Sequence, residues 1–223
     1  GQPIAQFAAR IMLGETLEQI GFLEEPRIDY YSVKEAVLPF NKFPGAEVRL
    51  GPEMRSTGEV MGIDPHPGLA FAKSQAAAGA ALPLTGGVFI SINDVDKEKF
   101  VSIAQRFLDL GFHLYCTDGT HRFLLKHGIA SAQLNKVQEG RPNVIDYVIN
   151  GQIKMVINTF SGGPQGRPDE QAIRSLVIAR GIPLVTTISA ARAGVEGIEA
   201  LRAQKITLRS IQEYHQSLHA LKG

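Results

Sequence analysis

Residues 87–120 read GVFISINDVDKEKFVSIAQRFLDLGFHLYCTDGT, and this stretch decides the fold class. The apolar run Val88–Ile92 is compact enough to be a buried strand. An asparagine and an aspartate follow it and can cap a helix. Apolar residues at helical spacing from Phe100 to Leu108 give that helix one apolar face. Phe112–Cys116 reads as the next strand. A strand, a helix and a second strand in this order predict a parallel pair joined by a helical crossover.

The same alternation continues along the rest of the chain. We expect further strands at Ala132–Val137, Met155–Asn158 and Leu184–Thr186, and further helices at Asn143–Ile149, Asp169–Arg180 and Ala190–Gln204. Strands that alternate with helices indicate an α/β fold, in which a parallel sheet is flanked by helices on both faces. Ligands of such sheets bind at the carboxyl ends of the strands.

The first 82 residues have a different pattern. Helices are expected at Pro3–Ile11, Thr16–Ile20 and Pro67–Ala78, and two strands at Tyr30–Leu38 and Ser56–Ile63. The run AAAGAALPLTGG, residues 76–87, is rich in small residues and is the clearest linker in the chain. It places a domain boundary near Pro83, so that residues 1–82 and 83–223 form two domains.

Bulk composition excludes several classes of protein. The chain has 223 residues, 44% of them hydrophobic and 20% charged, which is ordinary for a globular chain. A net charge of +1 gives no sign of the concentrated basic face that nucleic-acid and membrane partners usually require, so we expect neither partner. The single cysteine, Cys116, excludes an internal disulfide framework. It fits a reducing compartment and a cytoplasmic location.

Polar groups gather at the expected carboxyl ends of the strands. The turn Thr117–Thr120, TDGT, follows a strand and opens a helix, where hydroxyls and backbone N–H groups can bind an anion. Asn158 ends another strand, and Lys97 and Lys136 can each reach a phosphate as a point charge. Each of these features alone is also typical of a capped turn or a solvated surface lysine. Their arrival at one edge of one sheet favours a binding site.

Glu35 is the one charged residue on its strand face, which it shares with Tyr31, Val33 and Val37. A carboxylate on an apolar face should be paired or should bind a cation. A salt bridge to a nearby lysine or arginine explains it equally well.

The histidines show no spacing with cysteine or carboxylates that indicates a metal site, so none is expected. Cys116 reads as a buried strand residue rather than as a nucleophile, since no histidine and aspartate can be assigned to it.

Several strings identify a family. Residues 30–45, YYSVKEAVLPFNKFPG, and residues 51–62, GPEMRSTGEVMG, resemble the end of the second ATP-grasp half of the carbamoyl-phosphate synthase large subunit. Further on, TDGT, NKVQEGRPN (residues 135–143) and INTFSG (residues 157–162) resemble the regulatory domain of that enzyme. The resemblance covers nearly the whole chain. It implies the C-terminal part of the ATP-grasp component in residues 1–82 and a methylglyoxal-synthase-like domain in residues 83–223.

The family makes carbamoyl phosphate from bicarbonate, ammonia delivered by a glutaminase small subunit, and two ATP, for arginine and pyrimidine synthesis. Its regulatory domain binds UMP, commonly as inhibitor, and IMP, commonly as activator, while ornithine activates at the junction of the two domains. The resemblance therefore implies an allosteric role, with the rest of the large subunit and the small subunit as partners and an oligomer formed through the regulatory domain. ATP, Mg or Mn, and K as monovalent ion belong to the full enzyme. This fragment is expected to hold no cofactor and no catalytic residue, and to be inactive alone.

Carried over by position, the resemblance assigns residues to two effector sites. The nucleotide-binding residues are Lys97, Thr117, Thr120, Lys136 and Asn158, and the ornithine-binding residues are Glu35, Leu38 and Thr186. Phe160 departs from the family pattern, in which a threonine is common, and this leaves the preferred nucleotide open.

Three alternatives stay open at this point. A free-standing methylglyoxal synthase, which is a lyase, needs carboxylates near its phosphate loop, and residues 155–166 contain no Asp or Glu. An IMP cyclohydrolase domain shares the fold but does not fit the first 80 residues. The third alternative is an assembly module that holds synthase subunits together without a ligand.

Overall fold

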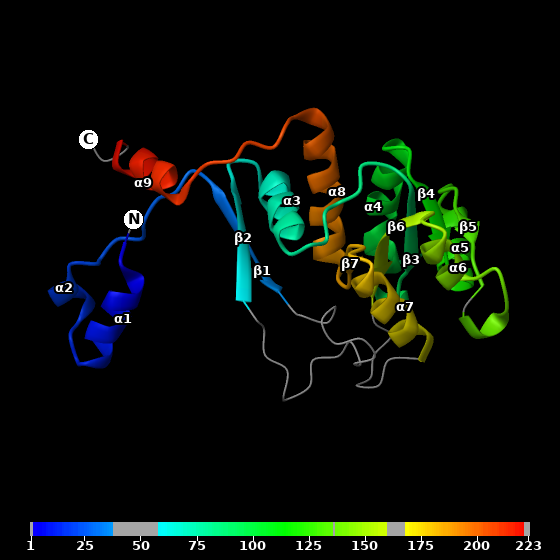
Figure 1. The fold of residues 1–223 in the computed structure, drawn as a ribbon, viewed down its shortest axis with the longest axis horizontal. Helices are drawn as coiled ribbons and strands as arrows, with labels where there is room; N and C mark the ends of the chain where they lie inside the picture. Colours follow the sequence, from blue (N-terminus) through cyan, green and yellow to red (C-terminus); the bar gives the residue numbers. More distant parts are fainter. Residues whose placement is uncertain (1, 38–57, 136, 160–167, 221–223) are drawn as a thin grey trace. The chain divides into compact units, whose positions relative to one another are not determined.

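The structure is a computed structural model that describes residues 2–37, 58–135, 137–159 and 168–220 (Figure 1). It divides into two compact units, one formed by Gly1–Asp29 with Thr207–Gly223 and the other by Tyr30–Ile206. The predicted boundary near Pro83 lies inside the second unit. That boundary is predicted between two functional domains. The division into compact units does not test it, so the boundary stays a prediction.

The first unit consists of short helices. They are α1 (Ile4–Met12), α2 (Leu17–Ile20) and α9 (Ile211–Ala220). Thr16 starts α2 with a capping box that it shares with Gln19, and Gly21 ends the helix in a left-handed conformation with φ of 76°. The rings of Phe7 and Phe22 pack with their centroids 5.3 Å apart. These local signals explain why the sequence indicates both N-terminal helices.

The second unit begins with a hairpin covered by a helix. Strand β1 (Tyr31–Val37) pairs antiparallel with β2 (Gly58–Asp64), and α3 (Pro67–Ala77) packs on both. Val33, Glu35 and Val37 are half-buried, while the residues between them are exposed, so the predicted alternation of β1 is confirmed from Val33 onward. Tyr31, expected on the same face, is exposed. His66 caps α3 by accepting a hydrogen bond from the backbone N–H of Gly68.

A five-stranded parallel sheet forms the rest of this unit, in the order β5-β4-β3-β6-β7. Its strands are β3 (Gly87–Ser91), β4 (His113–Cys116), β5 (Ala132–Gln133), β6 (Ile153–Asn158) and β7 (Leu184–Val185). Its helices are α4 (Lys97–Asp109), α5 (Asp118–Lys126), α6 (Val144–Ile149), α7 (Pro168–Ala179) and α8 (Ile188–Ala203). The predicted α/β class is therefore confirmed, with the small antiparallel sheet before it.

Both faces of the parallel sheet are covered (Figure 1). Val88 and Ile90 of β3 pack into a core with α4, α5 and α8, whereas Phe89 between them packs into a second core with α6 and α7. Alternate residues of one strand thus enter opposite cores, which is why its sequence is continuously apolar.

Two strand predictions need correction. The strand expected at Ala132–Val137 contains only Ala132–Gln133, and a 3-10 turn occupies Val137–Glu139. This strand pairs with β4 alone, at the edge of the sheet, and farther along Asn135 makes a single bridge to Asn143 at the start of α6. The last strand ends at Val185, so Thr186 lies just beyond it.

Candidate ligand-binding pocket

A cavity of about 260 Å³ lies at the carboxyl ends of β3, β4 and β6. Strand β3 lies between β4 and β6, so the strand order changes direction beside it. In α/β sheets, ligand-binding crevices form at such switch points. Its polar lining consists of Ser91, Asn93, Asp94, Lys97, Thr117, Gly119, Thr120, Asn158 and Glu170. Its apolar lining consists of Phe89, Ile92, Val137, Val144 and Ile173.

The cavity brings together four of the five residues expected to bind a nucleotide, namely Lys97, Thr117, Thr120 and Asn158. The fifth, Lys136, lies outside the described residues, as does Phe160. Val137, which follows Lys136 in sequence, lines the cavity. The residues are gathered as expected, and their role in binding stays a prediction.

Among the described residues that line the cavity, Lys97 supplies the positive charge. It is the first residue of α4, its side chain is only 15% exposed, and its ammonium lies 2.6 Å from Asp94 Oδ1. The hydrogen bond with Lys97 holds the pKa of Asp94 below its ordinary value. The Lys97 ammonium also lies 5.9 Å from the centroid of the Phe123 ring on α5. An anion at this position would meet an ammonium that is already desolvated and held in place.

The start of α5 adds hydroxyl and N–H donors. Thr117 is the N-cap of this nine-residue helix, and within the described part of the chain its side chain makes no capping hydrogen bond. Thr117 instead donates to Thr120 Oγ1 at 3.4 Å, and Thr120 Oγ1 also accepts from the backbone N–H of Ile92 at 3.2 Å. Because the Thr120 oxygen already accepts two bonds, its own proton is left to donate. Free N–H groups of a first helical turn suit an anion.

Asn158 ends β6 and is 1% exposed. Its Oδ1 atom has no hydrogen-bond partner among the described residues. Buried polar side-chain atoms in native proteins nearly always have a partner, and an exception calls for an explanation. Because Asn158 lines the cavity, a ligand that donates a hydrogen bond would satisfy this oxygen.

Sequence reasoning missed Glu170. It stands in the first turn of α7 and lines the cavity. The signal that would have found it is its place in the first turn of the helix that follows β6. Such turns face the carboxyl edge of a parallel sheet.

Glu35, the expected ornithine ligand, accepts a hydrogen bond from Gln75 Nε2 of α3 at 2.9 Å. Within the described ranges it forms no ion pair. The nearby lysines have other partners, since Lys34 pairs with Glu59 and Lys73 pairs with Asp64. Leu38 lies outside the described residues, and Thr186 follows β7. A shared site of these three residues stays a prediction.

The interpretation of Cys116 as a buried strand residue is confirmed. It is fully buried in β4, and burial raises the pKa of its thiol to about 12, while a hydrogen bond with Ser131 acts in the opposite direction. A thiol of this kind stays protonated near neutral pH and is a poor nucleophile. In the described part of the chain, no three histidine, cysteine or carboxylate side chains gather as a metal site would require. None of the described helices is long and apolar enough to cross a bilayer.

Comparison with known proteins places the chain in a class. Residues 99–186 match the family model of the MGS-like domain, and this range contains the described cavity residues from Thr117 to Glu170. The five-stranded parallel sheet with helices on both faces agrees with that match. The chain therefore contains an MGS-like domain.

Comparison of the chain with individual proteins identifies its family more specifically. The chain is 45% identical to the carbamoyl phosphate synthase large chain of Archaeoglobus fulgidus, over 97% of this chain and 20% of that protein. It is 48% identical to the carbamoyl phosphate synthase large chain of a Nostoc species, over 96% and 19% respectively. The rice (Oryza sativa subsp. japonica) protein named carbamoyl phosphate synthase arginine-specific large chain, chloroplastic, is 44% identical over 99% and 19%. The chain belongs to the carbamoyl phosphate synthase large-chain family, and it spans about a fifth of the length of these relatives.

One solved structure, described as "Crystal structure of ForH", matches 61% of this chain and 97% of that chain at 17% identity. Its TM-score of 0.32 is too low to carry an argument about fold or function.

Proposed function

We propose that this chain is the allosteric region of a carbamoyl phosphate synthase large chain and that its cavity binds a nucleoside monophosphate, with UMP and IMP as candidates. The grouping of Lys97, Thr117 and Thr120 around the start of α5 carries the proposal. An ammonium, two hydroxyls and the N–H groups of a helix end together suit a phosphate monoester. The remaining length of the cavity would hold the nucleoside.

The larger enzyme supplies the context of this proposal. Carbamoyl phosphate would be made from bicarbonate, ammonia and two ATP, with a glutaminase small subunit and the rest of the large chain as partners. ATP, Mg or Mn, and K would bind in those other parts, so this region alone would have no ligase activity. The product would serve arginine and pyrimidine synthesis, and the rice relative is named as arginine-specific. We also propose a cytoplasmic location for this chain and association through its MGS-like domain.

A lyase active site is the weaker alternative. It would need a carboxylate free to act as a base beside the bound phosphate. Among the described residues, two carboxylates line the cavity, but Asp94 is paired with Lys97 and its side chain is 92% exposed, while Glu170 belongs to α7 and not to the turn that starts α5. The arrangement favours binding over proton abstraction.

Lys97→Met should weaken UMP binding by roughly 10- to 100-fold. A hydrogen bond to a charged group contributes about 1.5–3 kcal/mol, and about 1.4 kcal/mol corresponds to a factor of ten in affinity. Isothermal titration calorimetry with UMP, IMP and inorganic phosphate measures the change. Inorganic phosphate should lose affinity along with the nucleotides, because the phosphate group is what Lys97 contacts.

Lys99→Met is the matched control, since Lys99 lies two residues further along α4 with its side chain 67% exposed. It should leave the affinity for UMP within twofold of that of the unmodified chain. The proposal is wrong if the unmodified chain binds none of the three compounds, or if both variants bind UMP equally well.

We further propose that ornithine binds at Glu35, with Leu38 and Thr186 as additional contacts. A carboxylate whose described partner is a neutral amide, on a half-buried strand face, keeps its charge available for an ammonium group. Binding of ornithine and of the nucleotide would each favour one arrangement of the protein. The coupling between them must be reciprocal and is typically about 1–3 kcal/mol.

Glu35→Gln should weaken ornithine binding by about tenfold or more and leave UMP affinity unchanged, because the amide cannot neutralise an ammonium group. Calorimetric titration with ornithine, alone and with UMP present, gives both affinities and their coupling. Glu59→Gln on the paired strand is the control, since Glu59 is half-exposed and pairs with Lys34. Equal ornithine affinity in the two variants would exclude Glu35 as the ligand.

A further inference from the structure

The cavity has two chemically different ends, and the strand order separates them. Thr117, Gly119 and Thr120 follow β4, which lies on one side of β3. Asn158 ends β6, on the other side of β3, and Glu170 lies in the first turn of α7, the helix that follows β6 in sequence. A ligand that fills the cavity therefore touches different chemistry at each end.

The end on the β4 side offers donors and a positive charge. The Lys97 ammonium lies 3.5 Å from where a Cβ atom on Gly119 would stand, which places it against the first turn of α5. Its ion pair is with Asp94. The protons of Lys97 and the Thr120 hydroxyl, with the N–H groups of α5, all donate hydrogen bonds. A phosphate, which only accepts hydrogen bonds when fully ionised, fits this end.

The end on the β6 side offers acceptors. Asn158 Oδ1 is buried and has no partner in the described part of the chain. Glu170 adds a carboxylate, which accepts hydrogen bonds and donates none when ionised. Helix α7 is held in place because Ile173 and Val177 pack into the core formed with Phe89 and Val156. The carboxylate therefore sits on a fixed support.

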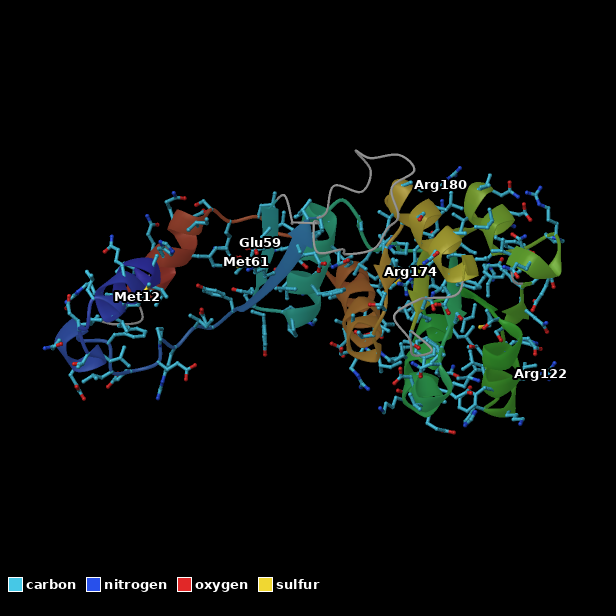
Figure 2. All side chains as sticks on the ribbon, turned by 90° about the horizontal axis from the view of Figure 1, so that it is seen from below. Met12, Glu59, Met61, Arg122, Arg174 and Arg180 are labelled. Atoms are coloured by element: carbon cyan, nitrogen blue, oxygen red, sulfur yellow. The ribbon has the colours of Figure 1, made fainter. Side chains whose placement is uncertain are left out.

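Arg174 lies one turn further along α7 from Glu170. The guanidinium of Arg174 lies on the same helix (Figure 2). Burial lowers the pKa of Arg174, and the negative charge of Glu170 opposes that shift. Because Glu170 lines the cavity, a second negative group beside it would be repelled by its carboxylate.

We propose that Glu170 is a specificity-determining residue of the cavity, which selects singly phosphorylated ligands whose other end carries hydroxyl or amino donors. This inference rests on the proposed function, because it presumes that the phosphate lies at Lys97 and the start of α5. Glu170 and Asn158 then accept hydrogen bonds from the sugar or base. A second phosphate on the ligand would extend toward a carboxylate and would be repelled.

Glu170→Gln tests this assignment. Titration calorimetry would use four probes, namely inorganic phosphate, ribose 5-phosphate, UMP and UDP. For the unmodified chain we expect UMP to bind at least tenfold more tightly than UDP. In the variant, UMP and ribose 5-phosphate should each lose about tenfold in affinity, because a charge-assisted hydrogen bond becomes a neutral one. The affinity for inorganic phosphate should be unchanged, and the ratio of UMP affinity to UDP affinity should decrease.

Glu59→Gln is the matched control, since it removes the same charge from the half-exposed surface of β2. Thermal unfolding of both variants without ligand checks that the fold is kept. If UMP affinity and the UMP-to-UDP ratio are unchanged in Glu170→Gln, the specificity role is overturned while the proposed function stands. If Glu170→Gln weakens all four probes equally, inorganic phosphate included, the specificity role is also overturned. If the unmodified chain binds none of the probes, the proposed function itself fails.

Discussion

Gly62→Ala is expected to lower the melting temperature by about 6–12 °C. A Cβ atom on Gly62 would stand 2.0 Å from the carbonyl oxygen of Ala70 and 2.6 Å from the backbone nitrogen of Ser74. Both atoms belong to the backbone of α3, so no side chain can turn away and the helix must move off β2. Overpacking costs about 1–3 kcal/mol and occasionally more, and we expect the upper end. At this chain length, about 1 kcal/mol corresponds to about 2–4 °C.

Gly58→Ala is the control for this prediction. Gly58 begins the same strand, and a Cβ atom there would meet nothing within 4 Å. Its melting temperature should stay within about 2 °C of that of the unmodified chain, as for most surface substitutions. Calorimetric unfolding of both variants compares them directly, and equal melting temperatures would show that α3 does not lie this close to β2.

The close approach at Gly62 is part of a wider pattern around α3. On another side of this helix, a Cβ atom on Gly68 would stand 2.7 Å from the carbonyl oxygen of Glu196, and one on Gly197 would stand 3.1 Å from the carbonyl oxygen of Gly68. Helices α3 and α8 therefore pack backbone to backbone, side by side in Figure 1. Within this unit, the contact connects the hairpin that carries Glu35, through α3, to the part that holds the parallel sheet and the cavity.

Local patterns predicted much of this architecture. The apolar face of α4 is buried at Phe100, Ile103 and Phe107, as its helical spacing indicated. The alternation of β1 placed Glu35 on the half-buried face for the same kind of reason. These features depend on residues a few positions apart, so periodicity alone reveals them.

Other features depend on contacts that are remote in the sequence. Helix α3 is rich in small residues and is buried against both the β1–β2 hairpin and α8. It therefore has no single apolar stripe from which these contacts could be predicted. The gathering of Thr117 and Asn158 around one cavity follows from the order of the strands, which no local pattern encodes. Strand β5 is short because it pairs with one neighbour only, at the edge of the sheet, whereas its sequence reads as a longer strand.

Asp64→Asn is expected to destabilise the protein by about 3–5 kcal/mol, the usual cost of breaking a buried ion pair from one side. The Lys73 ammonium lies 2.7 Å from Asp64 Oδ2, and the two side chains are only 12% and 6% exposed. Lys73 also donates to the carbonyl oxygen of Ile63 at 2.9 Å. The substitution keeps the shape of the side chain and an oxygen for the backbone N–H of His66, which bonds Asp64 at 2.8 Å. The loss therefore reports the uncompensated charge of Lys73.

Denaturant unfolding measures this loss, and two further variants isolate its cause. Glu59→Gln breaks the Lys34–Glu59 pair on the same hairpin, where the side chains are 64% and 53% exposed, and should cost no more than about 1 kcal/mol. Lys73→Met added to Asp64→Asn removes the stranded ammonium and should restore part of the lost stability. If Asp64→Asn costs no more than Glu59→Gln, water must reach the Asp64–Lys73 pair. In that case the pair does not hold β2 on α3, and the attachment of the hairpin rests on the close backbone contact at Gly62.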